Sequence, residues 1–241
     1  MIYVPPVNAK EFVIERIVEE TPAVRSFYLA PRDGKIFEFL PGQFVLVFLK
    51  DREGNVAKRA YSISSSPNEK GHVRITVALH AEFTKMLFAK KQGDAVTVTG
   101  PYGNFTLGEN LQEEAVFIAG GVGITPFFSM ISWASERMPQ KKMALFYSSR
   151  EPEHLIFLKE LGKVAEKNRN FRMALTITGE TCPLGVECFR RRIDEKMLRD
   201  TLGNLSGKQY YICGPAKMVE GMIDLLETLG VENTKIKNER W

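Results

Sequence analysis

The chain has 241 residues, a length that suits one large domain or two medium ones with a substantial core. Its 44% hydrophobic and 26% charged residues are typical of a globular protein and exclude a disordered, collagen-like or coiled-coil chain. The net charge of +4 is small, and lysine and arginine are scattered among acidic residues. Nucleic-acid binding is therefore not expected.

The hydrophobic segments of the chain are short. The longest, such as residues 44–49, fall far short of the ~20 apolar residues that span a bilayer, so no membrane span is expected. The first residues, Met1 to Pro6, contain no basic region followed by an apolar one, which argues against a signal peptide. We therefore expect a cytoplasmic location.

The cysteines and histidines argue against several kinds of site. Three cysteines are an odd number, which argues against a disulfide framework. Cys182 and Cys188, with five residues between them, leave a redox pair as an alternative. The sequence has no C-x-x-C, H-E-x-x-H or G-x-S-x-G motif, so we predict neither a metal site nor a serine nucleophile.

Residues 1–108 have the pattern of a β-domain. Turns such as Thr21-Pro22 and Gly93-Asp94 separate the apolar segments, and one short helix is expected over 84–91. Strands are predicted over residues 12–14, 25–29, 44–49, 72–79 and 95–99. Many short strands at this spacing predict a small antiparallel β-barrel.

Residues 109–241 have a different pattern, in which strands alternate with helices. Residues 115–119 form a continuous apolar run, typical of a strand that is buried on both faces. Further strands are predicted over 143–147, 171–177 and 210–213, with helices ending near 138 and over 154–167, 194–202 and 216–229. This alternation predicts an α/β domain with a parallel sheet, so we expect two domains with a boundary near residue 109.

A glycine-rich turn, residues 120–126, lies directly between a predicted buried strand and a helix. Gly121 and Gly123 let a backbone approach a diphosphate closely, and the helix that contains Thr125 offers its positive end to the anion. Pro126 stands where the usual dinucleotide fingerprint has a third glycine. A tight turn without a ligand is the competing interpretation.

The residues after the second strand of this domain bear on the choice of coenzyme. An acid there commonly binds the ribose hydroxyls of NAD, but this strand leads into Ser148-Ser149-Arg150. Arg150 suits the 2′-phosphate of NADPH. A solvent-facing arginine next to Glu151 is equally consistent, so NADH and NADPH both stay open.

The segment Arg59-Ala60-Tyr61-Ser62 carries a cation, an aromatic ring and a hydroxyl on one extended stretch. Alternation along a strand directs residues 59 and 61 to one face and residues 60 and 62 to the other. An arginine suits a diphosphate, and a tyrosine can lie against a flat ring. Alone, the segment is equally consistent with an ordinary surface strand.

Four motifs follow one another along the chain: Arg59-x-Tyr61-Ser62, Gly100-Pro101-Tyr102-Gly103-Asn104-Phe105, Gly120-Gly121-x-Gly123-Ile124-Thr125-Pro126 and Cys213-Gly214-Pro215-x-x-Met218. In this order they resemble the ferredoxin–NADP reductase superfamily, and the resemblance covers nearly the whole chain. It implies a flavin-binding barrel followed by a nicotinamide-nucleotide domain. It also implies transfer of hydride from NADPH or NADH to the flavin.

The resemblance implies a flavin site on the barrel, with FAD as the expected group and FMN as the alternative. Arg59, in the same motif as Ala60, would hold the diphosphate, Tyr61 would lie against the isoalloxazine, and Ser62 would hydrogen-bond near N5. Val77 would flank the flavin. The family's Gly-Gly-x-x-Ser/Thr element is reduced here to Thr84, whose hydroxyl would bind phosphate.

The resemblance implies a second set of residues for the nicotinamide nucleotide. Cys213 would lie where hydride leaves, although a small buried residue is the competing interpretation. Glu239 would act near Ser62 and Cys213, and Trp241 would cover the flavin, unless this end of the chain is frayed. The nucleotide itself would be held by Gly121, Gly123, Thr125, Gly214 and Pro215, with Arg150 at the ribose.

The electron acceptor is not identified by the sequence. The chain lacks the cysteines of an iron–sulfur segment, so electrons would leave to a separate carrier such as a ferredoxin or another redox protein, to a small molecule or to another subunit. Two alternatives stay open: a subunit that works only inside a larger oxidoreductase, and a nucleotide-binding module without redox function.

Overall fold

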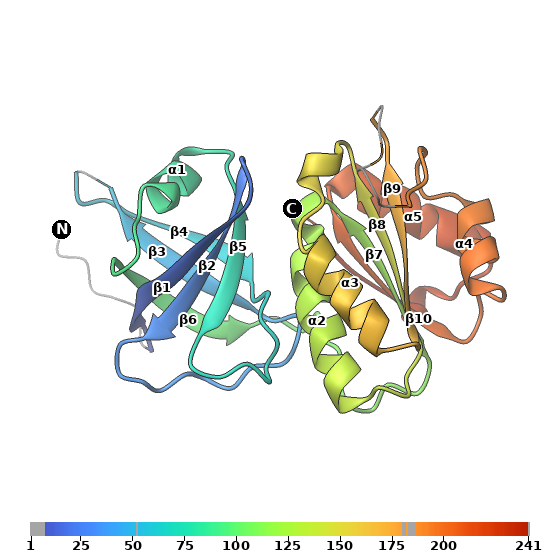
Figure 1. The fold of residues 1–241 in the computed structure, drawn as a ribbon, viewed down its shortest axis with the longest axis horizontal. Helices are drawn as coiled ribbons and strands as arrows, with labels where there is room; N and C mark the ends of the chain where they lie inside the picture. Colours follow the sequence, from blue (N-terminus) through green and yellow to red (C-terminus); the bar gives the residue numbers. More distant parts are fainter. Residues whose placement is uncertain (1–7, 52, 180–181, 183–186, 241) are drawn as a thin grey trace. The chain divides into compact units, whose positions relative to one another are not determined.

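The computed structural model describes residues 8–51, 53–179, 182 and 187–240. The chain divides into two compact units, Met1–Thr106 and Leu107–Trp241 (Figure 1). The first unit is built from antiparallel strands, and the second from parallel strands and helices. Each unit is described separately below.

The first unit is an antiparallel sheet in which the described residues form six strands in the order β4-β3-β6-β1-β2-β5. An antiparallel bridge between Ile63 and Ile75 links the ends of the β4 and β5 segments, so the sheet curls toward closure. The strands are β1 (Lys10–Thr21), β2 (Val24–Pro31), β3 (Phe44–Lys50), β4 (Val56–Ser62), β5 (Val73–Ala78) and β6 (Ala95–Tyr102).

The interior of this sheet is filled by alternating apolar side chains. Phe12, Phe27, Val47 and Ile75 are each fully buried. A single helix among the described residues of this unit, α1 (Glu82–Phe88), adds Phe83 and Leu87 to the same core. The prediction of an antiparallel β-domain is therefore confirmed.

The second unit is a parallel sheet in which the described residues form five strands in the order β11-β10-β7-β8-β9. The strands are β7 (Glu114–Gly120), β8 (Met143–Ser149), β9 (Phe171–Ile177), β10 (Lys208–Gly214) and β11 (Ile236–Arg240). Because β7 lies between β8 and β10, the chain reverses its direction of travel across the sheet after β9. Ligands of open α/β sheets bind at the carboxyl ends of the strands beside such a reversal.

Helices cover both faces of the parallel sheet (Figure 1). One face packs against α4 (Glu195–Leu202) and α5 (Ala216–Thr228) around Ile118, Phe146 and Ile212. The other face carries α2 (Ile124–Arg137) and α3 (Leu158–Lys167), and the Phe117 and Phe127 rings meet there at 5.2 Å. Burial on both faces explains the continuous apolar run predicted for β7, and the α/β prediction is confirmed.

Several element boundaries differ from the sequence prediction for local reasons. Asp194 caps α4 by accepting a hydrogen bond from the Met197 N–H, so the helix begins one residue later than expected. Phe157 has a left-handed φ of 62°, which separates a 3-10 turn, Pro152–His154, from α3. The terminal segment Ile236–Arg240 pairs in parallel with β10 and is a strand rather than a frayed end.

Among the helices of the described residues, none is both long and apolar enough to cross a membrane.

The amino end of the parallel sheet carries a nearly buried charge cluster. The Glu114 carboxylate is 9% exposed and accepts from Lys208 Nζ at 2.6 Å and from Arg172 at 2.5 Å. These three residues come from β7, β10 and β9, so the cluster ties the central strand to both sides of the sheet. The nearly buried charges of Glu114 and Lys208 are thus compensated by each other.

We predict that Glu114→Gln lowers the free energy of unfolding of this unit by about 2 kcal/mol, because the Lys208 ammonium loses its carboxylate. Asp200→Asn is the matched control: its exposed pair with Lys196 should change stability by less than ~0.5 kcal/mol. Urea denaturation followed by the fluorescence of buried Trp133 measures both. Equal effects of the two substitutions would contradict this assignment.

Candidate functional site

Most of the predicted flavin residues of the first unit lie on β4, while Val77 lies on β5 and Thr84 on α1. The Arg59 guanidinium lies 5.7 Å from the centre of the Phe83 ring, and the Tyr61 ring lies 6.3 Å from that ring. Arg59 is exposed, and Tyr61 and Ser62 are half-buried. The strand therefore presents a cation and an aromatic face on one side, as predicted from the alternation.

The Tyr61 phenol is neutral at neutral pH because it is half-buried. Burial raises the pKa of Tyr61 to about 12, and the nearby Arg59 charge opposes that rise. Tyr61 is thus a hydrogen-bonding and stacking group at neutral pH, not an acid or a base.

Two other predicted flavin residues have surroundings that limit their roles. Val77 is 1% exposed and packs in the barrel core, so its side chain is occupied by packing. The Thr84 hydroxyl accepts from the N–H groups of His80 and Ala81 and donates to the Ala81 carbonyl at 2.7 Å. Thr84 therefore orders its own loop.

In the second unit, the turns after β7 and β10 interlock. A Cβ placed on Gly123 would overlap the Cys213 carbonyl group and lie 2.9 Å from Gly214 N. A Cβ on Gly120 would overlap the Met218 sulfur. Glycines are required here because the two backbones touch directly, and Gly121 in addition has a φ of 53°. The two motifs are thus one structural unit at the carboxyl edge of the sheet.

The helix α2 begins directly after this turn. The Thr125 hydroxyl donates to the Val122 carbonyl at 2.9 Å, which holds the turn closed. Pro126 lies in the first helical turn, where its missing N–H costs no hydrogen bond. The start of this 14-residue helix, which continues from the 3-10 turn Gly121–Gly123, carries the positive end of the helix dipole and favours an anion at this point.

Cys213 and Glu239 are paired residues on the neighbouring strands β10 and β11. Cys213 is 4% exposed, and burial together with the Glu239 charge raises the pKa of its thiol well above the ordinary value. Burial raises the pKa of Glu239 from 4.5 to about 7. This edge of the site holds a neutral thiol beside a carboxyl group that titrates near neutral pH.

Arg150 and Glu151 follow the carboxyl end of β8. The Arg150 side chain is 86% exposed, and its Nε lies 3.9 Å from the Glu151 carboxylate. A cation for a phosphate and an acceptor for a ribose hydroxyl are therefore adjacent. Glu151 is a candidate binding residue that the sequence analysis treated only as a neighbour of Arg150.

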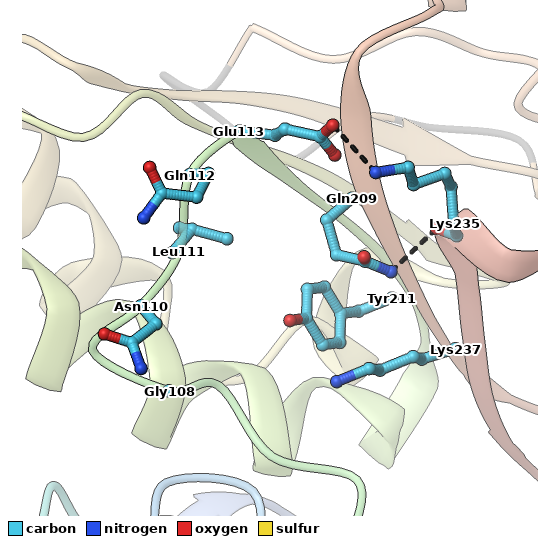
Figure 2. Close-up of a pocket in the computed structure, with 9 residues that line it drawn as sticks. All are labelled: Gly108, Asn110, Leu111, Gln112, Glu113, Gln209, Tyr211, Lys235 and Lys237. Atoms are coloured by element: carbon cyan, nitrogen blue, oxygen red, sulfur yellow. Dashed lines mark hydrogen bonds and ion pairs between the residues drawn. The ribbon is translucent and has the colours of Figure 1, made fainter.

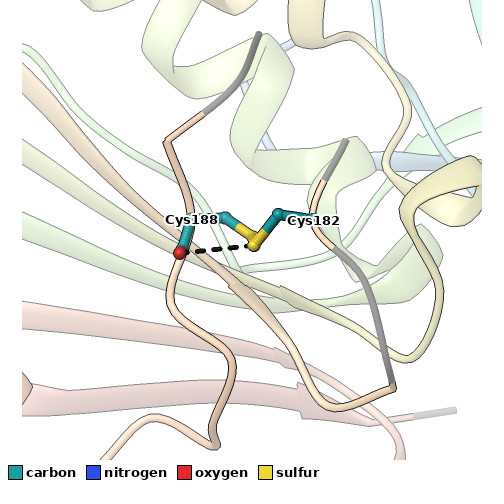
Figure 3. The surroundings of a disulfide bond; sticks show 2 residues. All are labelled: Cys182 and Cys188. Carbon is teal, nitrogen blue, oxygen red and sulfur yellow. Dashed lines mark hydrogen bonds between the residues drawn. A yellow bond between two sulfur atoms is a disulfide. The ribbon is translucent and has the colours of Figure 1, made fainter. Parts of the chain in front are cut away.

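Cys182 and Cys188 are joined by a disulfide, with their Cα atoms 6.0 Å apart (Figure 3). The sequence analysis left this pair as an alternative. The Cys182 sulfur also lies 3.3 Å from the Cys188 carbonyl oxygen, which can accept its S–H when the bond is reduced. Cys213, on β10, stays a free buried thiol.

A pocket of about 520 Å³ lies in the second unit between the segment 108–113 and the strands β10 and β11 (Figure 2). Glu113 and Lys235 form an ion pair of 2.8 Å at its edge, and Gln209 donates to the Lys235 carbonyl. It adjoins the amino ends of the strands and contains none of the predicted site residues. In the described part of the chain no cluster of three or more His, Cys, Asp or Glu residues could hold a metal ion.

Two known domain families match this chain, one for each unit. Residues 12–107 match the model of the oxidoreductase FAD-binding domain, and residues 117–224 match that of the oxidoreductase NAD-binding domain. The two matches follow the order of the units and together cover most of the chain. The chain belongs to the ferredoxin–NADP reductase superfamily, a family of flavin- and pyridine-nucleotide-binding oxidoreductases.

The curated relatives are longer than this chain. The chain is 30% identical to a flavohemoprotein of Bordetella pertussis, covering 95% of this chain and 60% of that protein. It is 26% identical to the reductase component of propane 2-monooxygenase from Rhodococcus jostii, covering 96% of this chain and 63% of that protein. The chain thus spans about 60% of the length of these curated relatives.

A solved structure has the same two-domain fold. The ferredoxin NADP⁺ reductase of Neisseria gonorrhoeae, crystallised with FAD and NADP, superimposes with a TM-score of 0.82 at 22% identity. The match covers 97% of this chain and 98% of that one.

The described residues fit both groups that these domains bind. At the start of α2 the Gly123 backbone packs directly on the Cys213 peptide with no side chain between the two turns, so the carboxyl edge of the sheet presents backbone there, as the close approach of a coenzyme diphosphate requires. The exposed Arg59 beside the Tyr61 ring supplies a cation and an aromatic face for a flavin nucleotide. Trp241 lies outside the described residues, so its predicted role stays a prediction.

We predict that Gly123→Ala weakens pyridine-nucleotide binding by at least about tenfold, because the new methyl group pushes the Cys213 peptide out of place. Gly221→Ala, in α5 where a Cβ meets nothing, is the control and should leave binding unchanged while favouring the helix. Calorimetric titration with the coenzyme measures both. Wild-type affinity in the Gly123 variant would contradict the interlocked-turn description.

The Glu239 carboxyl group predicts a pH-dependent stability. Its folded pKa of about 7 lies above the ordinary 4.5, so its contribution to stability is complete below pH 4.5 and is lost as pH rises through 7. The melting temperature of Glu239→Gln relative to wild type should therefore increase from pH 5 to pH 8. Exposed Glu166→Gln is the control, and a pH-independent difference for Glu239→Gln would contradict its burial.

Proposed function

We propose that the protein is a flavoprotein reductase that takes hydride from NADPH or NADH and passes electrons to a separate acceptor. The proposal rests above all on the interlocked turns that bring Gly123 against Cys213, with Glu239 on the adjacent strand. They support a nicotinamide site with a thiol and a carboxyl group beside it. A bound flavin would supply the hydride and single-electron chemistry, and the residues below would hold and orient it.

The chain's own groups bind and orient rather than act as strong acids or bases. In the proposal, Arg59 neutralises the flavin diphosphate, Tyr61 supports the isoalloxazine and Ser62 donates a hydrogen bond near N5. Val77 and Thr84 would support this site indirectly. Val77 packs in the barrel core, and the Thr84 hydroxyl accepts a hydrogen bond from the Ala81 N–H and so orders the loop before α1. Positioning of this kind provides most of the acceleration when the cofactor carries the chemistry.

In the second unit, the amides around Gly121, Gly123 and Thr125 would bind the coenzyme diphosphate. Cys213, together with Gly214 and Pro215, would line one side of the nicotinamide site. Because its pKa is raised, the Cys213 thiol stays protonated and adds no negative charge beside the ring. Glu239 in its neutral form would keep this edge of the site uncharged below pH 7.

The acceptor in the proposal is another redox protein. The relative from Rhodococcus jostii, named as a reductase component of a monooxygenase, supports this class of acceptor. The flavohemoprotein relative supports a second candidate, in which the acceptor is a domain or subunit attached to the reductase. In both cases the chain alone would reduce an artificial acceptor; a chain that works only as a subunit would show no physiological turnover until the rest of its complex is added.

Purified protein should be yellow and contain FAD after extraction and chromatography. Anaerobic titration with NADPH or NADH should bleach the flavin absorbance with one equivalent of coenzyme. A colourless protein that takes up no added FAD would contradict the proposed function and favour a module without redox activity.

We predict that Arg59→Ala raises the dissociation constant for FAD by about tenfold or more, because a charge-assisted contact to the diphosphate is lost. Lys58→Ala is the control, since its side chain leaves the same strand on the opposite face. Flavin content after gel filtration and fluorescence titration with FAD measure both. Equal losses in the two variants would remove the specific role of Arg59.

We predict that Arg150→Ala raises KM for NADPH by about tenfold and leaves KM for NADH nearly unchanged, because only NADPH carries the 2′-phosphate. Glu151→Gln is the complementary variant and should raise KM for NADH more than for NADPH. Steady-state reduction of ferricyanide measures both constants. A parallel rise for both coenzymes in Arg150→Ala would exclude Arg150 as the phosphate partner.

A further inference from the structure

Cys182 and Cys188, which form the disulfide, are partly exposed to solvent. Both residues are half-buried, whereas the third cysteine, Cys213, is 4% exposed. Thiol–disulfide exchange requires access to the sulfur atoms, so small thiols can attack this pair and leave Cys213 untouched.

The disulfide lies in a segment that leaves the edge strand β9 after Ile177 and returns to it at Phe189, and we call this segment the excursion. The Ile177 N–H donates to the Phe189 carbonyl at 2.9 Å, and the Phe189 N–H donates to the Leu175 carbonyl at 2.8 Å. The chain that leaves β9 therefore returns to it at Phe189. Cys188 immediately precedes this junction, and the disulfide ties Cys182, six positions earlier in the chain, to it (Figure 3).

The first residues of the same excursion pack on the end of β8. Thr178 N–H donates to the Ser149 carbonyl at 3.0 Å, and Gly179 N–H donates to the Arg150 carbonyl at 2.8 Å. A Cβ on Gly179 would overlap that carbonyl and lie 2.9 Å from both Glu151 carboxylate oxygens. The excursion thus supports the backbone that carries Arg150 and Glu151, the residues proposed for the adenosine ribose.

The local charge favours reactive thiols. Glu187 precedes Cys188 and Arg190, Arg191 and Arg192 follow it, which gives residues 187–192 a net charge of +2, whereas Glu180 lies on the Cys182 side. Arg191 is partly engaged, with its guanidinium 5.6 Å from the Phe189 ring centre and 3.4 Å from Asp194. Positive charge stabilises a thiolate, the species that performs exchange.

We propose that Cys182 and Cys188 are a reversible thiol–disulfide site whose oxidation state sets the affinity of the second unit for the adenosine end of the pyridine nucleotide. The inference rests on the proposed function, because it needs a coenzyme at Arg150 and Glu151. The oxidant is a small disulfide such as oxidised glutathione. One thiolate attacks it and releases one thiol; the second cysteine then displaces the other thiol. Two electrons and two protons pass from the cysteine pair to the reagent.

The direction of the effect follows from conformational entropy. The disulfide ties Cys182 to Cys188 beside the Phe189 junction, which limits how far the chain after Gly179 can move from the end of β8. In the reduced protein this backbone has more freedom, and coenzyme binding must order it. The oxidised form therefore binds coenzyme more tightly. Because coupling between two sites is reciprocal, bound coenzyme makes the disulfide harder to reduce by the same factor.

The first test measures the disulfide without using catalysis. Holoprotein is equilibrated in mixtures of reduced and oxidised glutathione, with and without NAD⁺ or NADP⁺, and free thiols are alkylated and counted by mass spectrometry. The oxidised coenzyme carries no hydride, so it cannot act as a reductant. The oxidised coenzyme should stabilise the disulfide. It should lower, by about fivefold or more, the proportion of oxidised to reduced glutathione at which half of the protein carries the bond.

The second test measures coenzyme affinity in both states. Reduction with dithiothreitol should raise the dissociation constant by the same factor of about fivefold, with the flavin spectrum unchanged. The double variant Cys182→Ser/Cys188→Ser should bind like the reduced protein and should not respond to dithiothreitol. Since wild-type protein is compared with itself, the test does not depend on the folding of the variant.

Distinct results separate this inference from the proposed function. Equal affinities in the two states, an unshifted glutathione ratio, or a peptide map of oxidised protein without the 182–188 crosslink would overturn the thiol–disulfide site alone. A flavin-loaded protein that binds no pyridine nucleotide in either state would contradict the proposed function, and the inference with it.

Discussion

The direct contact of two backbones, at Gly123 and at the Cys213 carbonyl, is the constraint on which the second unit's site depends. It joins the turn after β7 to the turn after β10, so two segments distant in sequence form one cradle. Side chains cannot intervene there, which is why glycines occupy both turns. Burial of Cys213 and the proximity of Glu239 follow from the same arrangement. The positions of the thiol, the carboxyl group and the helix start are thereby fixed together.

In the first unit, side-chain packing rather than backbone contact positions the residues of the candidate site. The β4 strand places Arg59 and Tyr61 on one face, and α1 brings Phe83 to meet them. The helix is anchored in the barrel core by Leu87, which is fully buried. The cation and the ring are therefore held by the packing of the barrel, and the half-buried phenol stays neutral. Each unit is suited to one nucleotide cofactor.

The sequence was most informative where periodicity and composition act locally. The buried run at β7, the glycine turn and the Arg59–Ser62 segment all lie in the elements expected for them. Less predictable were features set by distant residues. The strand β11 is polar and exposed, and only its pairing with β10 makes it a strand. Val77 and Thr84 lie on the expected elements, but packing and loop hydrogen bonds occupy their side chains. The Cys182–Cys188 bond and the contact of Gly179 with Arg150 depend on how the chain returns to β9.

The central claim is that the flavin held by this chain takes hydride directly from a reduced pyridine nucleotide. Anaerobic stopped-flow mixing with coenzyme deuterated at the transferred C4 position tests it most directly. The account predicts a single-turnover loss of flavin absorbance that is about two- to fivefold slower with the deuterated coenzyme, as expected when breaking the C–H bond limits the step. Flavin that stays oxidised in the presence of saturating NADPH and NADH would contradict it.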